Sequence, residues 1–172
     1  MWVFGYGSLM WDGWETKRGC TQRVLADLSG YCRRFNKASV RNWGTRTVPG
    51  PTLNLSEVTA GVCRGIAFEF PDAHKAEILA YLGEREGKAF TFREVSVRIE
   101  DQSELTAFVP LYDGKNVIEG KPIEEVAKMV LAASGTDGTC LDYVNGIAKK
   151  LSALGIDDPA VAELWNAVEN HA

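Results

Sequence analysis

Residues 1–11 read MWVFGYGSLMW, and this stretch joins a short apolar run to a glycine-containing turn. The run Trp2–Phe4 predicts a short buried strand, since large apolar side chains in series suit a strand covered on both faces. Gly5 and Gly7 then end that strand. Glycine has no Cβ, so these positions allow a positive φ and a close approach of the backbone to another group. That group is either another part of the protein or a ligand held by peptide N–H groups.

Composition predicts one folded domain over residues 1–172. Hydrophobic residues make up 45% of the chain and charged residues 24%, which is typical of globular proteins. The net charge of −4 argues against nucleic acid or an anionic membrane as the main partner. No stretch of the sequence reaches the roughly 20 apolar residues that span a bilayer. The sequence points to no particular protein partner.

Cysteine and histidine spacing predicts neither a disulfide framework nor a metal site. There is no CxxC pair, so reduced thiols in a cytoplasmic protein are expected. The sequence also lacks a P-loop and a GxGxxG motif, and therefore no cofactor is expected. The four cysteines are widely scattered, at positions Cys20, Cys32, Cys63 and Cys140.

Strand-like segments come first and helices follow, which favours an α+β fold with a curved or barrel-like sheet. A helix is expected from Asp72 to the break at Gly87, and three more fill the last third of the chain. Those three start at Pro122, after a loop over 135–138, and at Asp158–Pro159. Apolar alternation and short apolar runs between turns predict further strands over 31–39, 52–58, 63–70, 92–99 and 105–112.

The turn from Gly5 to Ser8 is the first candidate site. Glycines at the end of a strand most often form only a turn. The functional interpretation is a cluster of backbone N–H groups that can hold a carboxylate or a developing oxyanion. Ser8 would add a hydroxyl, and Tyr6 would form a wall of the site or donate a hydrogen bond.

The acidic end of the helix before Gly87 is the second candidate. Most carboxylates on a surface helix are solvated and have no specific role. Glu86 differs because it lies at the helix C-terminus, where the negative end of the dipole raises the pKa of a nearby carboxyl group. A raised pKa suits a general acid and base near neutral pH. Glu84 and Glu77 have comparable claims, and spacing does not decide among the three.

Polar aromatic residues and a pair of arginines complete the candidates. Tyr112 and Tyr143 belong to a class that is more often part of the core, with a satisfied hydroxyl, than a ligand contact. Arg33 and Arg34 alternate sides of a predicted strand, so one of them is expected to face inward. A buried arginine needs a partner carboxylate.

Taken together, these segments resemble the ChaC-type (glutathione-specific) γ-glutamylcyclotransferases of the γ-glutamylcyclotransferase-like superfamily. The opening VFGYGSLMW over 3–11 is similar to the family's VFGYGSL-x-W. The stretch LGEREGKAF over 82–90 is similar to its L-x-x-R-E-x-x-x-Y. Shorter similarities extend the resemblance over nearly the whole chain, at 31–35, 65–67, 111–112 and 132–144.

This resemblance implies a single domain built as a small mixed β-barrel flanked by helices, with helices concentrated in the C-terminal third. It implies a cofactor-independent lyase that converts a small γ-glutamyl substrate, glutathione above all, into 5-oxoproline and a released amine such as Cys-Gly. Among the acidic candidates it selects Glu86 as the general acid and base. The implied substrate contacts come from the opening loop and from two tyrosines that close the pocket: Val3, Phe4, Gly5, Tyr6, Gly7, Ser8, Tyr112 and Tyr143.

The chain departs from the family pattern in three places. Phe90 stands where tyrosine is usual, Lys88–Ala89 replaces Gly-Gly, and residues 40–49 lack the Asp-His-Arg-Gly-Thr-Pro pattern. Connecting loops often shape the leaving-group side of a site. Two alternatives therefore stand beside glutathione cleavage. One is the same chemistry on γ-glutamyl amino acids or γ-glutamylamines, and the other is a non-catalytic module that binds a small carboxylate.

Overall fold

Five strands of the computed structural model, which describes residues 1–171, close into a barrel in the order β1–β3–β2–β4–β5. β1 pairs antiparallel with β3 and parallel with β5, so the barrel is mixed. This confirms the α+β barrel that the resemblance implies. The strands are β1 (Trp2–Gly5), β2 (Gln22–Ser39), β3 (Gly50–Glu69), β4 (Phe90–Ile99) and β5 (Glu104–Tyr112).

The chain forms two compact units. The first unit comprises residues 1–32 and 55–114, and the second comprises residues 33–54 and those from 115 onward. The long strands β2 and β3 are each divided between the two units. That residues 1–172 form a single domain stays a prediction.

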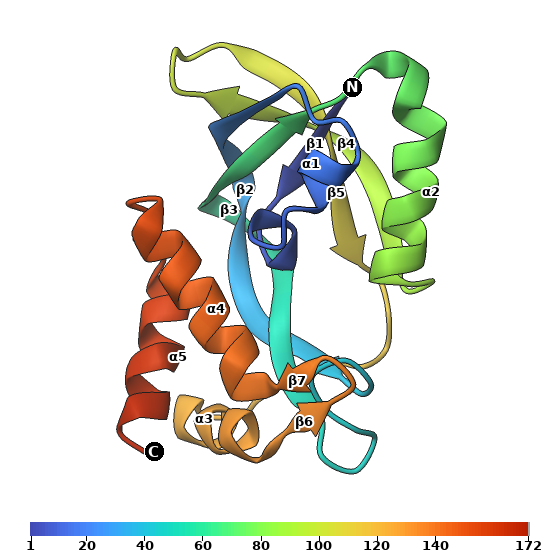
Figure 1. Cartoon of the computed structure of the whole chain (residues 1–172). Helices are drawn as coiled ribbons and strands as arrows, with labels where there is room; N and C mark the ends of the chain where they lie inside the picture. The colour runs from blue at the N-terminus through green and yellow to red at the C-terminus, as the bar shows by residue number, and fades with distance from the viewer. Residues whose placement is uncertain (172) are drawn as a thin grey trace. The chain divides into compact units, whose positions relative to one another are not determined.

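In the first unit, helix α2 lies beside strand β4 of the barrel (Figure 1). A short 3-10 turn, η2 (Asp72–His74), leads into α2 (Lys75–Glu86), as the sequence predicts. The helix ends where Gly87 adopts a φ of +90°, a conformation that glycine takes without steric cost. Two short elements that the sequence does not predict follow β1, namely η1 (Ser8–Met10) and α1 (Trp14–Lys17).

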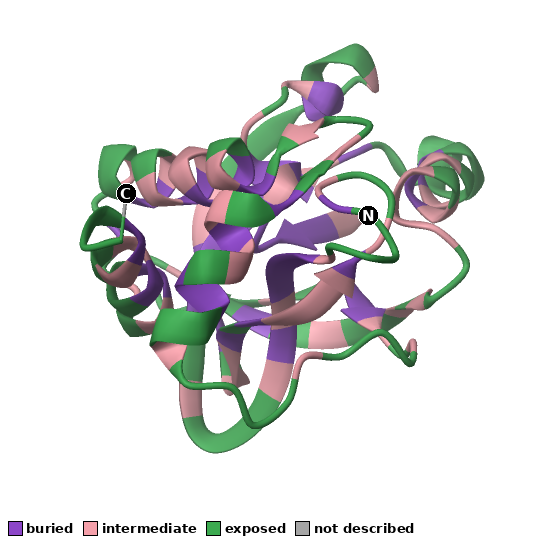
Figure 2. Cartoon of the chain, turned by 90° about the horizontal axis from the view of Figure 1, so that it is seen from below, coloured by how far each residue is buried: buried purple, intermediate pink, exposed green. Residues whose placement is uncertain are grey.

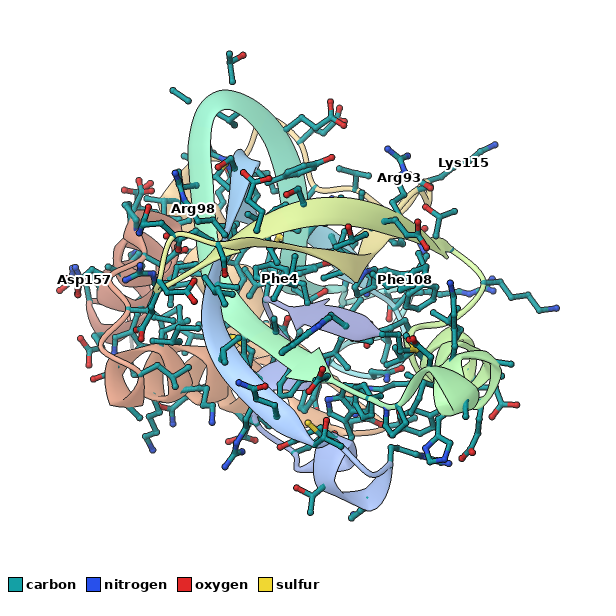
Figure 3. The ribbon with its side chains drawn as sticks, turned by 90° about the horizontal axis from the view of Figure 1, so that it is seen from above. Phe4, Arg93, Arg98, Phe108, Lys115 and Asp157 are labelled. Carbon is teal, nitrogen blue, oxygen red and sulfur yellow. The ribbon has the colours of Figure 1, made fainter. Side chains whose placement is uncertain are left out.

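Burial of β1 on both faces explains its unbroken apolar sequence. Val3 and Phe4 are both fully buried. Val3 is in register with Phe68 of β3 and with Phe108 of β5. Figure 3 shows Phe4 inside the barrel, whereas Arg93 of β4 points away from it. Burying one such apolar side chain contributes roughly 1.5–3 kcal/mol, so β1 anchors the barrel from within.

In the second unit three helices pack against one another: α3 (Ile123–Ala132), α4 (Cys140–Ala153) and α5 (Pro159–Glu169). Each has a buried side and an exposed side (Figure 2), as helical spacing of apolar residues predicts. Asp158 begins α5 by accepting hydrogen bonds from the N–H groups of Ala160 and Val161.

The same unit contains the inward arginine that the sequence predicts. Arg33 is buried and donates to the carboxylate of Asp158 at 2.9 Å, whereas Arg34 is exposed. The prediction of one buried arginine with a carboxylate partner is therefore confirmed. The pair ties β2 to the start of α5 within this unit.

Three boundaries differ from the predictions. β3 is one strand from Gly50 to Glu69, where the sequence predicts separate strands over 52–58 and 63–70. Its central residues 57–60 are exposed, so the apolar pattern is interrupted although the strand is not. The strand predicted over 31–39 already begins at Gln22. The predicted loop around 135–138 includes a small hairpin of β6 (Ser134–Gly135) and β7 (Gly138–Thr139).

Candidate active site

Close packing, rather than a positive φ, explains the glycine at the end of β1. Gly5 and Gly7 are not among the residues with positive φ, and Gly7 has a φ of −134°. A Cβ on Gly5 would lie 3.0 Å from the ring of Phe68 and 3.1 Å from the Cβ of Leu9. The group that approaches this backbone closely is thus another part of the protein, and a larger residue would displace it.

Side-chain hydrogen bonds hold the turn after β1 from two directions. The hydroxyl of Tyr6 donates to the carbonyl of Pro110 on β5 at 2.9 Å. The indole N–H of Trp14 donates to the carbonyl of Leu9 at 2.9 Å. Both bonds are buried, which makes them costly to break. The turn is consequently fixed both to the barrel and to α1.

Two backbone amides in this turn remain available. Within residues 1–171 neither the N–H of Gly7 nor that of Ser8 donates to an acceptor of the protein. Gly7 is buried and Ser8 is half-buried. A buried N–H without an acceptor is uncommon, and such donors are suited to bind an anionic oxygen. The turn therefore has the donors that the oxyanion interpretation requires.

The degree of burial distinguishes Glu77, Glu84 and Glu86, the three carboxylates that sequence spacing does not separate. Glu86 is the last residue of α2, and its side chain is 15% exposed. Glu77 is 64% exposed and pairs with Arg18 at 3.1 Å. Glu84 is exposed. Among these three, only Glu86 is largely shielded from solvent, which is a useful property in a group that exchanges a proton with a bound substrate.

The end of α2 is joined to the ends of β4 and β5. The N–H of Phe90 donates to the carbonyl of Gly87 at 3.1 Å. Phe90 is in register with Tyr112, and their ring centroids lie 5.2 Å apart. Tyr112 is thereby placed near the helix end that carries Glu86. A tyrosine at position 90 would add a hydroxyl to this aromatic pair.

Arg85 connects the same helix end to the segment after the glycine turn. Its guanidinium donates to Asp12 at 2.5 Å, and its Nε lies 3.4 Å from an oxygen of Glu86. Burial opposes the charge of Arg85, but hydrogen bonds with Tyr81 and Asp12 outweigh it and raise the pKa of the guanidinium. Sequence reasoning used Arg85 only as part of a motif and missed Asp12.

Tyr81 of α2 strengthens this connection. Its ring stacks on Trp14 with centroids 5.9 Å apart, and the guanidinium of Arg18 lies 4.1 Å from its centroid on the α1 side. Cation–π and stacking contacts of this kind each contribute about 0.5–1 kcal/mol or more. Within the first unit, the end of α2 is thus linked to the segment after the turn through Arg85 and Asp12, and to Tyr112 through Phe90.

Tyr143 lies in the second unit, on α4. Its ring is buried, and its hydroxyl accepts a hydrogen bond from the N–H of Leu53 at 3.1 Å. The ring also contacts Trp43, with centroids 5.2 Å apart. This arrangement matches a core tyrosine with a satisfied hydroxyl. A role for Tyr143 beside the substrate stays a prediction.

The described residues contain no group of three or more His, Cys, Asp or Glu side chains that could hold a metal ion. The four cysteines are free thiols. Burial raises the pKa of Cys140 to about 12, so this thiol is protonated at neutral pH. In residues 1–171 every helix falls short of the length and apolarity of a membrane span.

Comparison of the sequence with models of protein families identifies the family of this chain. The sequence model of the ChaC-like protein family matches residues 1–171. The chain belongs to this family. The ChaC-like assignment covers both compact units, including the glycine turn and the end of α2.

Individual ChaC-like relatives match over most of their length. The gamma-glutamylcyclotransferase 2-3 of Arabidopsis thaliana is 30% identical over 181 residues, covering 99% of this chain and 89% of that protein. The glutathione-specific gamma-glutamylcyclotransferase of Escherichia coli is 27% identical over 174 residues, covering 98% and 73%. A crystal structure of a gamma-glutamyl cyclotransferase specific to glutathione from yeast has a TM-score of 0.88 at 21% identity, covering 99% and 96%. At that identity the structural match shows the shared fold.

Proposed function

We propose that this ChaC-like chain is a γ-glutamylcyclotransferase that cleaves glutathione to 5-oxoproline and Cys-Gly. The observation that carries the proposal is the pairing of two features within the first unit. A shielded carboxylate, Glu86, ends α2, and unpartnered amides at Gly7 and Ser8 lie in a turn tied to that helix end through Arg85. Relatives named gamma-glutamylcyclotransferase match nearly the whole chain, and the one from Escherichia coli is named as specific to glutathione.

The reaction needs a base, an acid and an oxyanion site. The α-amino nitrogen of the γ-glutamyl group attacks its own γ-carbonyl carbon, so one C–N bond forms and closes a five-membered ring. The bond from that carbon to the cysteinyl nitrogen then breaks. Glu86 takes one proton from the attacking ammonium and gives it to the departing nitrogen. The ring nitrogen, which keeps one hydrogen in the lactam, loses its second proton to the released amine, so that Cys-Gly leaves as an ammonium. The amides of Gly7 and Ser8 stabilise the negative charge on the carbonyl oxygen.

Ring closure explains why so few groups suffice. The attacking and attacked atoms belong to one molecule, so holding the substrate in a folded conformation supplies much of the rate increase. The backbone of residues 3–8 is the proposed holder of the γ-glutamyl group, since β1 and its turn are rigidly packed. Tyr112, close to the end of α2, and Tyr143 are proposed as further substrate contacts.

A direct assay tests the proposal. The purified protein is incubated with glutathione, and 5-oxoproline is quantified for the wild type, Glu86→Gln and Glu84→Gln. We expect Glu86→Gln to lose at least about 100-fold in kcat/KM, the usual minimum for a lost general base. Glu84 is exposed two residues away, so Glu84→Gln is the matched control and should retain activity. Equal activity of all three proteins would exclude Glu86 as the base.

The substrate is tested in the same experiment. γ-Glutamyl-alanine and a γ-glutamylamine run in parallel with glutathione identify the leaving group by their relative kcat/KM. The departures at Phe90, at Lys88–Ala89 and over 40–49 make this comparison informative. Binding of a small carboxylate without turnover, unaffected by Glu86→Gln, would support the non-catalytic module instead. The cytoplasmic location remains a prediction from cysteine usage.

A further inference from the structure

Arg85 lies between two carboxylates at the end of α2. Its Nη1 is 2.5 Å from Asp12, and its Nε is 3.4 Å from Glu86. The contact with Asp12 meets hydrogen-bond criteria, whereas the contact with Glu86 is at ion-pair distance. The Arg85 and Glu86 side chains are 18% and 15% exposed, so solvent screens their interaction only partly.

A full salt bridge between Arg85 and Glu86 would hinder the proposed reaction. An arginine that binds a carboxylate by two hydrogen bonds holds it in the ionised form and occupies the oxygens that must accept a proton. Asp12 binds Nη1, on the other edge of the guanidinium from the Nε that lies next to Glu86. Asp12 also contributes a second negative charge on the far side of Arg85, which offsets the effect of the cation on Glu86.

We infer that Asp12 is a positioning residue: its carboxylate holds Arg85 and offsets the charge of that cation beside Glu86, the proposed general base. This inference rests on the proposed function. Asp12 follows directly after Trp11 and the turn that presents the amides of Gly7 and Ser8. The same ion pair therefore fixes the distance between the oxyanion donors and the helix end that carries the base.

The other charged groups of the first unit around this helix end are engaged elsewhere or exposed. Arg18 pairs with Glu77 at 3.1 Å, and Arg93 pairs with Asp113 at 3.4 Å. The neutral hydroxyl of Tyr81 forms a hydrogen bond with Arg85 itself. The remaining charged side chains next to Glu86 in the sequence are the exposed Glu84 and Lys88.

Charge-changing variants separate this role from a merely structural one. Asp12→Asn keeps an acceptor oxygen but removes the charge, which leaves the Arg85 cation beside Glu86 without its counter-charge. The acidic limb of kcat/KM against pH, where Glu86 loses its proton, should then move to lower pH by about half to one unit. Arg85→Gln removes the cation and leaves Asp12, so the limb should move to higher pH. The double variant should lie between the two, and Arg85→Lys should lie close to the wild type.

A second measurement is independent of turnover. The side-chain carboxyl of Glu86 is titrated by NMR in protein labelled at the glutamate Cδ, and its resonance is assigned by its loss in Glu86→Gln. We expect the same opposite shifts for Asp12→Asn and Arg85→Gln, with Glu84→Gln as the unshifted control. Identical midpoints in all variants would overturn the inference, even if the wild type produces 5-oxoproline. Opposite shifts without turnover would support the charge arrangement and count against the proposed function alone.

Discussion

Arg33 and Arg85 each pair with a carboxylate, but their surroundings differ. Arg33 and Asp158 have side chains that are 0% and 10% exposed, whereas those of Arg85 and Asp12 are 18% and 40% exposed. Breaking a buried pair leaves a charge that water cannot reach, but a partly exposed pair exchanges its partner for solvent. The comparison teaches that the same interaction type is shielded from water in one unit and accessible to it in the other, where we propose a role in chemistry.

The largest effect on stability is expected when the buried arginine is removed. Arg33→Met leaves the Asp158 carboxylate without its cation, although the N–H groups of Ala160 and Val161 still donate to it. We expect a loss of about 3 kcal/mol in the free energy of unfolding, at the lower end for a broken buried pair. Urea denaturation measures this loss.

The neighbouring arginine is the control. Arg34 is exposed on the opposite side of β2, so Arg34→Met should change the free energy of unfolding by less than about 0.5 kcal/mol. The double variant Arg33→Met/Asp158→Asn removes both charges and should recover much of the loss. A single Arg33→Met variant as stable as the wild type would show that the buried pair has no stabilising role.

A buried but uncharged contact of the same unit should have an intermediate effect. Tyr143→Phe leaves the N–H of Leu53 without its acceptor, at an expected cost of about 1–2 kcal/mol. Tyr31→Phe is the control, because its hydroxyl contacts Glu57 at 3.4 Å in an exposed position. Thermal unfolding is measured for both variants. A larger loss of stability in Tyr31→Phe than in Tyr143→Phe would contradict the prediction.

The Asp12–Arg85 pair should contribute little to stability. Asp12→Asn is expected to lower the free energy of unfolding by less than about 1 kcal/mol, the usual range for partly exposed pairs. Denaturation at pH 7 and the pH profile of activity are measured on the same sample. A large stability loss with an unshifted profile would place this pair in the same class as Arg33–Asp158.

The smallest effect is expected at a surface ion pair whose two side chains are both exposed. The Lys121 ammonium lies 2.8 Å from Glu125, and its hydrogen bond and charge lower the pKa of that carboxyl group. A lowered folded-state pKa contributes stability above the unfolded value and loses it as the pH falls through the folded value. Lys121→Ala should therefore be slightly less stable at pH 7 and match the wild type well below about pH 4. A difference that grows on acidification would contradict this.

Elements with regular apolar spacing were predictable, and the exceptions have a physical cause. β1 follows from Trp2–Phe4 alone, and α2 follows from its start at Asp72 and its end at Gly87. The middle of β3 did not follow, because exposed residues 57–60 continue a strand that is held by its neighbours. Apolar periodicity in a sequence reflects which residues are buried. A strand segment that is exposed to solvent therefore shows no such periodicity and is not predicted.

The candidate site was predictable only in part. The glycine turn and the acidic helix end are visible in the sequence, but Glu77, Glu84 and Glu86 are equivalent there. Their different exposure depends on tertiary packing of α2. The pairing of Asp12 with Arg85 joins residues that are distant in sequence, and neither one signals the other. The motifs thus indicate candidate residues, whereas the arrangement of charges around them depends on the tertiary structure.

The parallel pairing of β1 with β5 has a consequence for how the protein is made. Trp2 pairs with Ala107, so the first strand to leave the ribosome can complete its pairing only after the last strand of its unit is made. Such non-local pairing slows folding and leaves an apolar edge exposed in the meantime. The turn that presents the Gly7 and Ser8 amides is held by Pro110 of the same late strand. A nascent chain halted before β5 would therefore contain every residue of the glycine turn and still lack its anchor.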